Sequence, residues 1–401
     1  MASAKVLFWV CVLSLIYGYV GYPILIRLRA MLRPCPPHRP AGEPTVSVLV
    51  LAHNEATRIA RRIENLLALD YPRGDVEIII VSDGSTDGTP ERARVYEAAG
   101  VTVIPFETRR GKPAVLNDVV PKARGEIVVL ADARQHFESR ALQAIVAAFA
   151  DPQVGAVSGD LILGTDGRAT GVSRGIGFYW RYEKFIRKNE SRVDSTVGAT
   201  GAIYAIRREL FEAMPEDTFL DDVLIPLRIT RKGYRVLFES GARAHDQAAL
   251  TTREEFTRKV RTITGNFQLF AREPWLLNPL ANRLWVQTVS HKGLRLLSPL
   301  FLAAALGSNL FLWDEFFYQC TLALQVTLYA AALAGYAGSN SRAKIPLLSI
   351  PYIFCLLNGI TVVAFLRFIS GSQQVTWEKA RNIRWPTSSQ RAQRWMRFIG
   401  G

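Results

Sequence analysis

Four long apolar segments constrain the fold of this chain more than any other feature of its sequence. Each is long enough to cross a lipid bilayer as a helix, and they run over Val6–Ile26, Leu294–Leu312, Phe316–Ala337 and Ile345–Ile369. Yet the mean hydropathy of the 401 residues is only +0.10, which is too low for a protein made solely of membrane spans. The sequence therefore predicts a globular domain between an N-terminal anchor and a C-terminal group of spans.

Basic residues beside these segments predict how the chain is oriented. Arg27, Arg29 and Arg33 follow the first segment, which favours an anchor with its N-terminus outside over a cleaved signal peptide. Much of the net charge of +14 lies at such boundaries, which is typical of contact with lipid headgroups and not of a nucleic-acid interface. We therefore expect a multi-pass protein of the cell (inner) membrane with a cytoplasmic globular domain and no nucleic-acid partner.

The C-terminal part of the chain leaves a conflict. With the N-terminus outside, four spans would place the C-terminus outside, whereas its basic tail favours the cytoplasm. Proline, asparagine and glycine interrupt Ile345–Ile369, so we expect that this segment is re-entrant. The predicted organisation is an anchor over 1–33, a proline-rich linker over 34–44, a globular domain over 45–270, an interfacial amphipathic helix over 271–293 (with Trp275–Lys292 as its core), membrane segments over 294–370 and a basic tail over 371–401.

Short apolar runs alternate with helical patterns in the globular region. The runs predict buried strands at Val46–Ala52, Glu77–Ser82, Val101–Pro105 and Ile127–Ala131. Helical spacing predicts helices between them at Glu55–Leu69, Thr89–Ala99 and Ala114–Ala123. This alternation is typical of an open, mainly parallel α/β sheet with helices on both faces, which binds ligands beyond the carboxyl ends of its strands.

Polar residues follow three of these predicted strands. They are Asn54 and Glu55, then Asp83, then Asp132 and Arg134. Taken singly, each resembles an ordinary turn or helix-capping residue. Together at one sheet edge they can bind a base, a ribose or a cation that holds a diphosphate. The basic stretch Arg109–Lys112 opens a helix between them, which is typical of a phosphate site.

A series of motifs resembles the family 2 glycosyltransferases with a GT-A fold, in particular their membrane-embedded, polysaccharide-synthase-like branch. From Thr45 to Gly265 the motifs are VSVLVLAHNE, IIIVSDGSTDGT, RRGKPAVLN, LADA, GATGAIYAIRRELF, FLDDV, GYRVLFESGARA and RKVRTITGNF. The resemblance implies a Rossmann-like mixed sheet that binds a nucleotide sugar, with a UDP-sugar as the expected donor.

The resemblance also implies roles for individual residues. Asp222, beside Asp221, stands at the position of the general base that deprotonates the acceptor. Without the resemblance, the two acids would be read as favourable partners of a helix N-terminus. The remaining roles are base and ribose contacts for Asn54, Glu55 and Asp83, diphosphate contact for Lys112, ribose and metal contact for Asp132, and acceptor or diphosphate contact for Thr200, Gly201 and Arg261.

The chain departs from the family pattern in two places. Arg134 replaces the second Asp of the DxD motif, and its guanidinium could pair with the diphosphate in place of part of the metal's charge. We still expect Mg²⁺ or Mn²⁺ at Asp132. His136 could be a further ligand, but it is more readily interpreted as a surface or helix-capping histidine. Around Arg261 the Gln and Trp of the QxxRW motif are absent, which favours single transfer over processive synthesis.

The expected function is therefore inverting transfer of a sugar to a membrane lipid or glycan, in exopolysaccharide, cell-wall glycan or glycolipid synthesis. The alternatives are a processive polysaccharide synthase and a catalytically silent scaffold that assembles with partner subunits. Retention of Asp222 favours an enzyme over a scaffold. A transporter is disfavoured, because the apolar segments hold few charges.

Overall fold

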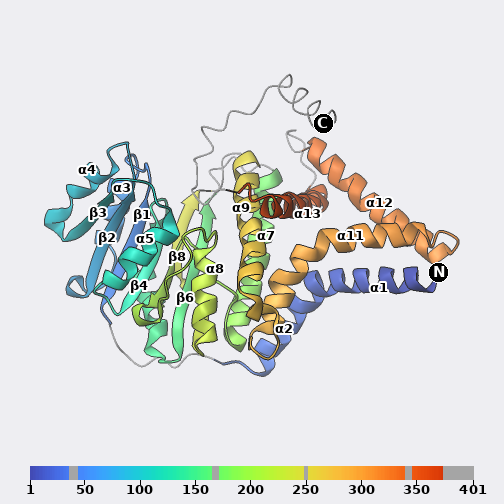
Figure 1. The fold of residues 1–401 in the computed structure, drawn as a ribbon, viewed down its shortest axis with the longest axis horizontal. Helices are drawn as coiled ribbons and strands as arrows, with labels where there is room; N and C mark the ends of the chain where they lie inside the picture. The colour runs from blue at the N-terminus through green and yellow to red at the C-terminus, as the bar shows by residue number, and fades with distance from the viewer. Residues whose placement is uncertain (36–43, 165–170, 248–251, 339–345, 374–401) are drawn as a thin grey trace, which may run out of the picture.

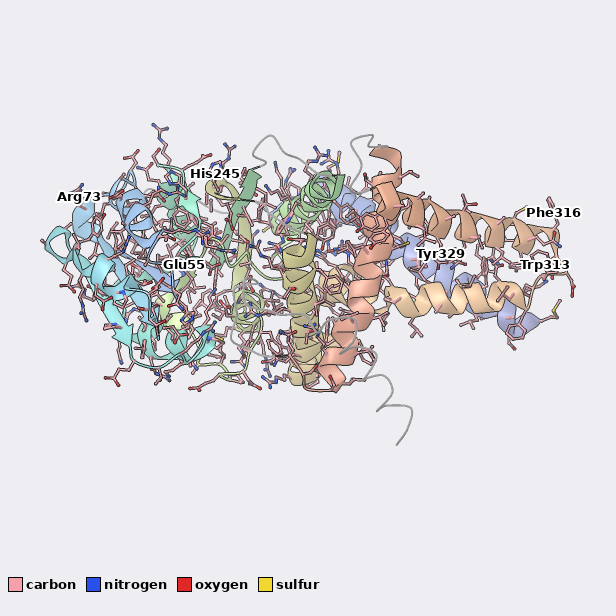
Figure 2. The ribbon with its side chains drawn as sticks, turned by 90° about the horizontal axis from the view of Figure 1, so that it is seen from above. Glu55, Arg73, His245, Trp313, Phe316 and Tyr329 are labelled. Carbon is pink, nitrogen blue, oxygen red and sulfur yellow. The ribbon has the colours of Figure 1, made fainter. Side chains whose placement is uncertain are left out.

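An α/β domain and a group of long apolar helices occupy opposite ends of the molecule (Figure 1). The computed structural model describes residues 1–35, 44–164, 171–247, 252–338 and 346–373. Most of the predicted proline-rich linker and most of the predicted basic tail therefore lie outside the described residues. Figure 2 shows the same division from above, with Glu55 and His245 in the α/β domain and Trp313 and Phe316 at the far tip of the helices.

A single mixed sheet forms the α/β domain. Its strand order is β3-β2-β1-β4-β7-β6-β8-β5. The first four neighbours, β3 (Val101–Phe106), β2 (Val76–Asp83), β1 (Val46–Ala52) and β4 (Ile127–Asp132), are parallel. The sheet continues through β7 (Tyr204–Arg207), antiparallel to β4 and to β6 (Val154–Gly164), then β8 (Arg235–Gln247), parallel to β6, and β5 (His136–Phe137). The predicted fold class and all four predicted strands are confirmed.

Helices cover both faces of the sheet because its strands are apolar on both sides. Along β1, Val48 and Val50 belong to the apolar cluster that contains α3 (Ile59–Leu67) and α6 (Ala141–Val146). Leu49, which points the other way, belongs to the cluster that contains α5 (Lys112–Val119) and α8 (Asp221–Arg231). The core thus forms two layers, one on each face of the sheet.

The predicted helices exist, but their bounds differ. The first begins at Ile59, because residues 55–58 form a turn in which the Glu55 carbonyl accepts from the amides of Arg58 and Ile59. The second consists of α4 (Thr89–Arg94) and a separate 3₁₀ turn at Glu97–Ala99. The third begins at Lys112, two residues before the predicted start, so Lys112 lies at the helix N-terminus.

Four helices are long and apolar enough to cross a membrane, judged by length and composition. They cover Ala2–Leu32, Trp285–Leu310, Phe316–Ala337 and Leu348–Ile369. The first contains α1 (Ala2–Ile16), a π-helical turn and α2 (Tyr22–Leu32); the others contain α11 (Leu294–Leu310), α12 (Phe316–Ala337) and α13 (Pro346–Ile369). Large apolar side chains on these helices are exposed, such as Leu324 at 72% and Leu333 at 69%, as contact with lipid requires.

The predicted interfacial helix over 271–293 is wrong as a single helix. The helix α9 (Thr252–Arg272) ends before Pro274, and a 3₁₀ turn follows at Pro274–Leu277. The side chain of Asn282 then stabilises a loop. Its Nδ2 donates to the Leu276 carbonyl, and its Oδ1 accepts from the Leu284 backbone amide. A new helix begins at Trp285 and continues through the π-helical turn η8 (Thr288–Gly293) into α11.

The expectation of a re-entrant segment at Ile345–Ile369 is also wrong, because α13 is one continuous helix. Pro346 opens the helix, where a missing amide hydrogen costs nothing, and Pro351 lies in its second turn. Seen from above, α13 runs across α1, α11 and α12 instead of alongside them (Figure 2). It packs against α9 and α7 (Gly171–Val193), the helices that stand between the α/β domain and the other apolar helices.

Candidate active site

The carboxyl ends of β1, β2 and β4 lie side by side at one edge of the sheet. The strand register pairs Ala52 with Ser82 and Leu51 with Asp132. The polar residues that follow these strands therefore share this edge, as the sequence predicts. The ends of parallel strands are where α/β sheets bind ligands, so this edge is the candidate site.

Asp83 fastens the basic loop to the end of β2. Its Oδ1 accepts a hydrogen bond from the Arg110 amide at 2.7 Å and its Oδ2 accepts one from the Gly111 amide at 2.9 Å. The loop approaches so closely that a Cβ on Gly84, where φ is +60°, would lie 2.4 Å from the Arg109 nitrogen. Asp83 therefore positions the loop that opens α5, which the sequence did not indicate.

Asn54 and Glu55 organise the neighbouring loop. Asn54 has a positive φ of 55°, and its Oδ1 accepts from the Thr86 amide at 2.8 Å. Glu55 is buried, and its Oε2 accepts from Arg58 Nη1 at 3.1 Å. The Asn54 side chain thus links the ends of β1 and β2, while the Glu55 carboxylate lies inside the fold.

Lys112 joins three carboxylates at the centre of this edge. Its Nζ lies 3.0 Å from Asp221 Oδ2 and 3.5 Å from Asp132 Oδ1. Burial disfavours the ammonium, but the charges of Asp221, Asp132 and Asp222 outweigh this effect and raise the pKa of Lys112. The side chains of Lys112 and Asp132 remain 22% and 34% exposed, so an anion can reach the ammonium from solvent.

Asp221 and Asp222 form the first turn of α8 and face different partners. Asp221 Oδ2 accepts from the Tyr204 hydroxyl at 2.9 Å, and Asp222 Oδ2 accepts from the Gly201 amide at 2.8 Å. Burial, together with the charge of Asp221, raises the pKa of Asp222 to about 6, against the opposing charges of Lys112 and Arg187. A carboxylate with this pKa can accept a proton at neutral pH and release it again.

Of Thr200, Gly201 and Arg261, only Gly201 contacts the acidic pair directly. The Thr200 amide donates to Ser158 Oγ at 3.1 Å, which fixes the loop before β7. A Cβ on Gly201 would lie 3.2 Å from Asp222 Oδ2 and 3.7 Å from Lys112 Nζ. Arg261, on α9, reaches the Phe219 carbonyl with its Nη2 at 3.5 Å. Gly201 therefore contacts Asp222, while Thr200 and Arg261 contact the chain segments that lead to β7 and to α8.

Within the described residues, the side chains predicted to hold a metal do not form a complete set of ligands by themselves. Asp132 lies beside Lys112, and Arg134 Nη2 lies 3.6 Å from Asp246 Oδ2. His136 is exposed on β5, with its Nε2 3.5 Å from Asn65 Nδ2. Nowhere in the described part of the chain do three His, Cys, Asp or Glu side chains gather in a way that could hold a metal ion.

Two residues near Asp222 were missed by the sequence reasoning. Tyr204 donates to Asp221, and the charge of Arg187 acts on Asp222 from α7. The spacing of Glu183, Arg187 and Glu190 was an available signal, because it places three ionisable side chains on one face of a helix. Tyr204 lies in an apolar strand pattern that gives no such signal.

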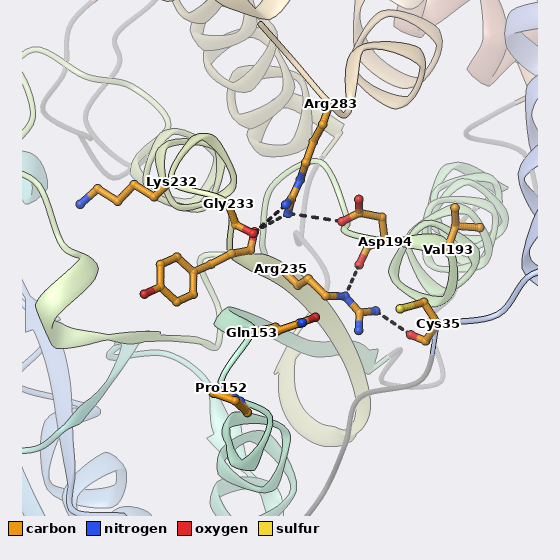
Figure 3. Close-up of a pocket in the computed structure, with 10 residues that line it drawn as sticks. Cys35, Pro152, Gln153, Val193, Asp194, Lys232, Gly233, Arg235 and Arg283 are labelled. Carbon is orange, nitrogen blue, oxygen red and sulfur yellow. Dashed lines mark hydrogen bonds and ion pairs between the residues drawn. The ribbon is translucent and has the colours of Figure 1, made fainter.

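A cavity of about 550 Å³ lies at the opposite edge of the sheet (Figure 3). Its lining includes Gln153, just before β6, and Arg235, the first residue of β8, so it faces the amino ends of these strands. Arg235 donates to the Cys35 carbonyl at 2.6 Å and to the Asp194 carbonyl at 3.1 Å. These bonds attach the chain after α2 to the α/β domain, which is a structural role.

Comparison with known proteins identifies the family of the α/β domain. Residues 47–214 match the family model described as Glycosyl transferase family 2. A beta-monoglucosyldiacylglycerol synthase of Nostoc sp. is 40% identical over 118 residues, which are 28% of this chain and 25% of the relative. A poly-beta-1,6-N-acetyl-D-glucosamine synthase of Staphylococcus aureus is 23% identical over 233 residues, covering 57% and 56% of the two chains. The chain thus spans between a quarter and just over half of the length of these curated relatives.

One solved structure has a similar fold over nearly the whole chain. It is the mannosyltransferase PcManGT from Pyrobaculum calidifontis in complex with GDP-Man and Mn²⁺, with a TM-score of 0.70, 24% identity and coverage of 92% of this chain and 100% of that one. At this identity the likeness concerns the fold, including the apolar helices. With the family match over 47–214, it follows that the chain carries a family 2 glycosyltransferase domain built on the GT-A fold.

Proposed function

We propose that this glycosyltransferase transfers a sugar from a nucleotide sugar to a membrane-associated lipid or glycan, with inversion at the anomeric carbon. The proposed donor is a UDP-sugar. The observation that carries the proposal is the placement of Asp222. Its carboxylate is oriented by the Gly201 amide, lies beside the Lys112 site and has a pKa of about 6. These are the properties of a general base that works at neutral pH.

The reaction is a single displacement. The acceptor oxygen attacks the anomeric carbon and forms the new C–O bond, while the bond from that carbon to the diphosphate oxygen breaks. The acceptor proton passes to Asp222, and the electron pair of the broken bond leaves with the nucleoside diphosphate. Attack opposite the leaving group inverts the configuration at the anomeric carbon.

The donor would lie along the edge formed by β1, β2 and β4. Asn54, Glu55 and Asp83 belong to the loops at which we place the base and ribose, with Asp132 near the ribose. Lys112 and Arg134 supply positive charge for the diphosphate. Since Asp132 is paired with Lys112 and Arg134 replaces an acid, this edge supports neutralisation of the diphosphate chiefly by side chains.

The acceptor would approach from the side of the apolar helices. Relatives named as a glucosyldiacylglycerol synthase and a poly-N-acetylglucosamine synthase favour a glycolipid or a glycan as the product. The absence of the QxxRW aromatic near Arg261 favours single transfer over processive synthesis. We place the protein in the cell (inner) membrane with the α/β domain in the cytoplasm, where nucleotide sugars are made.

The test is nucleotide release by the full chain purified in detergent, with membrane lipid extract and a panel of UDP-sugars and GDP-mannose. Release should require one donor and require lipid, and it is measured with Mn²⁺ and with EDTA. Asp222→Asn should lower it by at least about a hundredfold while UDP binding is retained. Asp314→Asn, an exposed acid at the far tip of the helices, is the matched control.

Two results would contradict the proposal. Unchanged release by Asp222→Asn would remove Asp222 from the general-base role. UDP binding without release from any donor would favour the silent scaffold or a missing partner subunit. Loss of release in EDTA, restored by Mn²⁺, would instead reject the assignment of the diphosphate charge to Lys112 and Arg134 alone.

A further inference from the structure

Three cationic side chains from different elements lie near one another, because the charge of Arg187 acts on both Lys259 and Lys292. Arg187 belongs to α7, Lys259 to α9 and Lys292 to η8. Within the described residues, Arg187 and Lys292 make no hydrogen bond or ion pair, and the Arg187 Nε atom is buried without an acceptor. Both side chains are only partly buried, and neither is held by a hydrogen bond or ion pair, so each can take an anion supplied from outside the chain.

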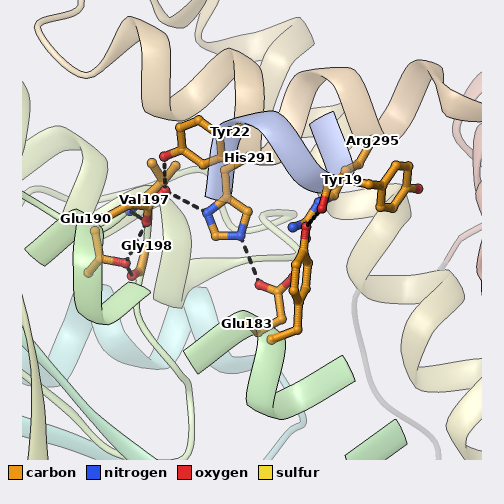
Figure 4. A network of polar contacts seen from close by, with 10 residues as sticks. Tyr19, Tyr22, Glu183, Glu190, Val197, Gly198, His291 and Arg295 are labelled. Atoms are coloured by element: carbon orange, nitrogen blue, oxygen red, sulfur yellow. Dashed lines mark hydrogen bonds and ion pairs between the residues drawn. The ribbon is translucent and has the colours of Figure 1, made fainter. Parts of the chain in front are cut away.

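The acidic side chains nearby are already engaged by other groups (Figure 4). Glu190 accepts from the Tyr22 hydroxyl at 2.6 Å and contacts His291 Nδ1 at 2.9 Å. Glu183 contacts His291 Nε2 at 2.9 Å and is paired with Arg295. This network fixes η8, and with it Lys292. Within the described residues neither Arg187 nor Lys292 forms an ion pair with these carboxylates, and the charges interact only at longer range.

Lys259 completes the group from the third helix. Its Nζ lies 4.5 Å from the centre of the Tyr179 ring and 5.4 Å from that of Trp180. Its carboxylate partner, Glu255, is 4.0 Å away, and burial lowers the pKa of Lys259. An added anion would therefore stabilise its charged form.

These cations and Lys112 approach Asp222 from different elements. Lys112 belongs to the sheet edge, where it contacts Asp132 and Asp221. The charge of Arg187, on α7, acts on Asp222. The charge of Asp222 in turn acts on Lys292, which belongs to η8. The donor diphosphate requires the first set of charges, which leaves the second set for the substrate that enters from the membrane side.

We propose that Arg187, Lys259 and Lys292 bind a phosphate group of the acceptor, so that the acceptor is a phosphorylated membrane lipid. This inference rests on the proposed function, because it names the acceptor class for the same Asp222. A phosphorylated acceptor would exclude both a diacylglycerol-type lipid and a neutral glycan, because neither carries a phosphate group.

The experiment measures binding to the full chain in detergent by calorimetry. The probes are geranylgeranyl phosphate and geranylgeranyl diphosphate, with geranylgeraniol as the neutral lipid and inorganic diphosphate as the free anion. Arg187→Gln and Lys292→Gln should each weaken binding of the phosphorylated lipids by about tenfold or more, with UDP affinity unchanged. Lys292→Arg should retain binding, and Lys188→Gln, the exposed neighbour on α7, should have no effect.

Each outcome decides between the possibilities. Equal binding of geranylgeraniol, or unchanged affinity in Arg187→Gln and Lys292→Gln, would overturn the inference. Inorganic diphosphate that binds as tightly as the lipids and competes with UDP would assign the cations to the donor, and would overturn it too. UDP binding and nucleotide release are measured on the same preparations, so a failure of the proposed function is recognised separately.

Discussion

At the scale of single residues, the pKa of Asp222 sets the pH range in which the proposed enzyme works. A general base must be ionised, so kcat/KM should fall by about tenfold per pH unit below pH 6. The charge of Lys112 opposes the upward shift of this pKa, so Lys112→Gln should move the acid limb of the profile to higher pH. Release rates across the acidic and neutral range test this, with the exposed Lys122→Gln as control. If the acid limb of the Lys112→Gln profile stays at the same pH, the charge of Lys112 does not affect the pKa of Asp222.

Gly84 tests the close approach of the basic loop to β2. Gly84→Ala adds a Cβ 2.4 Å from the Arg109 nitrogen at a residue with a φ of +60°, whereas Gly100→Ala, at a φ of +87°, meets no atom within 4 Å. Both variants bear the strain of a positive φ, about 1 kcal/mol. Gly84→Ala should cost more than about 2 kcal/mol and weaken UDP binding. Thermal unfolding and UDP titration measure both effects, and equal losses in the two variants would contradict the close contact.

The site residues differ in how far the sequence could predict them. The strand-end residues could be predicted, because the apolar runs locate the strands and parallel strands end at one edge. The hydrogen-bond or charge partner of each of these side chains could not be predicted. Asp83 binds the loop backbone, which depends on a turn whose geometry no spacing reveals. The charge of Arg187 acts on Asp222 from α7, an interaction between segments distant in the sequence.

At the scale of elements, His291 holds together segments from three parts of the chain. It lies between the buried carboxylates Glu183 and Glu190 of α7, and Glu190 also binds Tyr22 of α2. His291→Ala removes the shared partner of both acids and should lower stability by about 3–5 kcal/mol. His136→Ala, at an exposed histidine, should change it by less than about 0.5 kcal/mol. Thermal unfolding in detergent compares the two, and similar small losses would show that the network contributes little.

Strands were easier to predict than helices, for a physical reason. A strand buried on both faces needs an unbroken apolar run, and β1 has the predicted bounds. Helix ends depend on local hydrogen bonds that compete with the helix, such as those of Asn282 in the loop that replaces the expected interfacial helix. Prolines misled the prediction for α13, because Pro346 opens the helix, where proline is tolerated, and the helix continues through Pro351.

At the scale of the whole molecule, the direction of α13 leads us to propose three membrane crossings instead of four. Lys5, near the N-terminus, pairs with Glu315 in the turn between α11 and α12 at 2.5 Å, so both lie at the same tip. With that tip outside, the N-terminal helix, α11 and α12 cross the membrane and return the chain to the cytoplasm. Because α13 runs across these helices and packs on α7 and α9, it would lie along the cytoplasmic surface of the membrane.

This arrangement predicts on which side each end of the apolar helices lies. In a background without the four native cysteines, a cysteine is placed at Asp314, in the turn at the far tip, or at Ser372, just after α13; both residues are exposed. A membrane-impermeant thiol reagent added to intact cells should label Asp314→Cys and leave Ser372→Cys unmodified until the cells are opened. If α13 crossed the membrane instead, Ser372→Cys would be labelled in intact cells together with Asp314→Cys. Labelling of Asp314→Cys alone would support three crossings, the arrangement that the positive-inside rule favours for the basic sequence after α13.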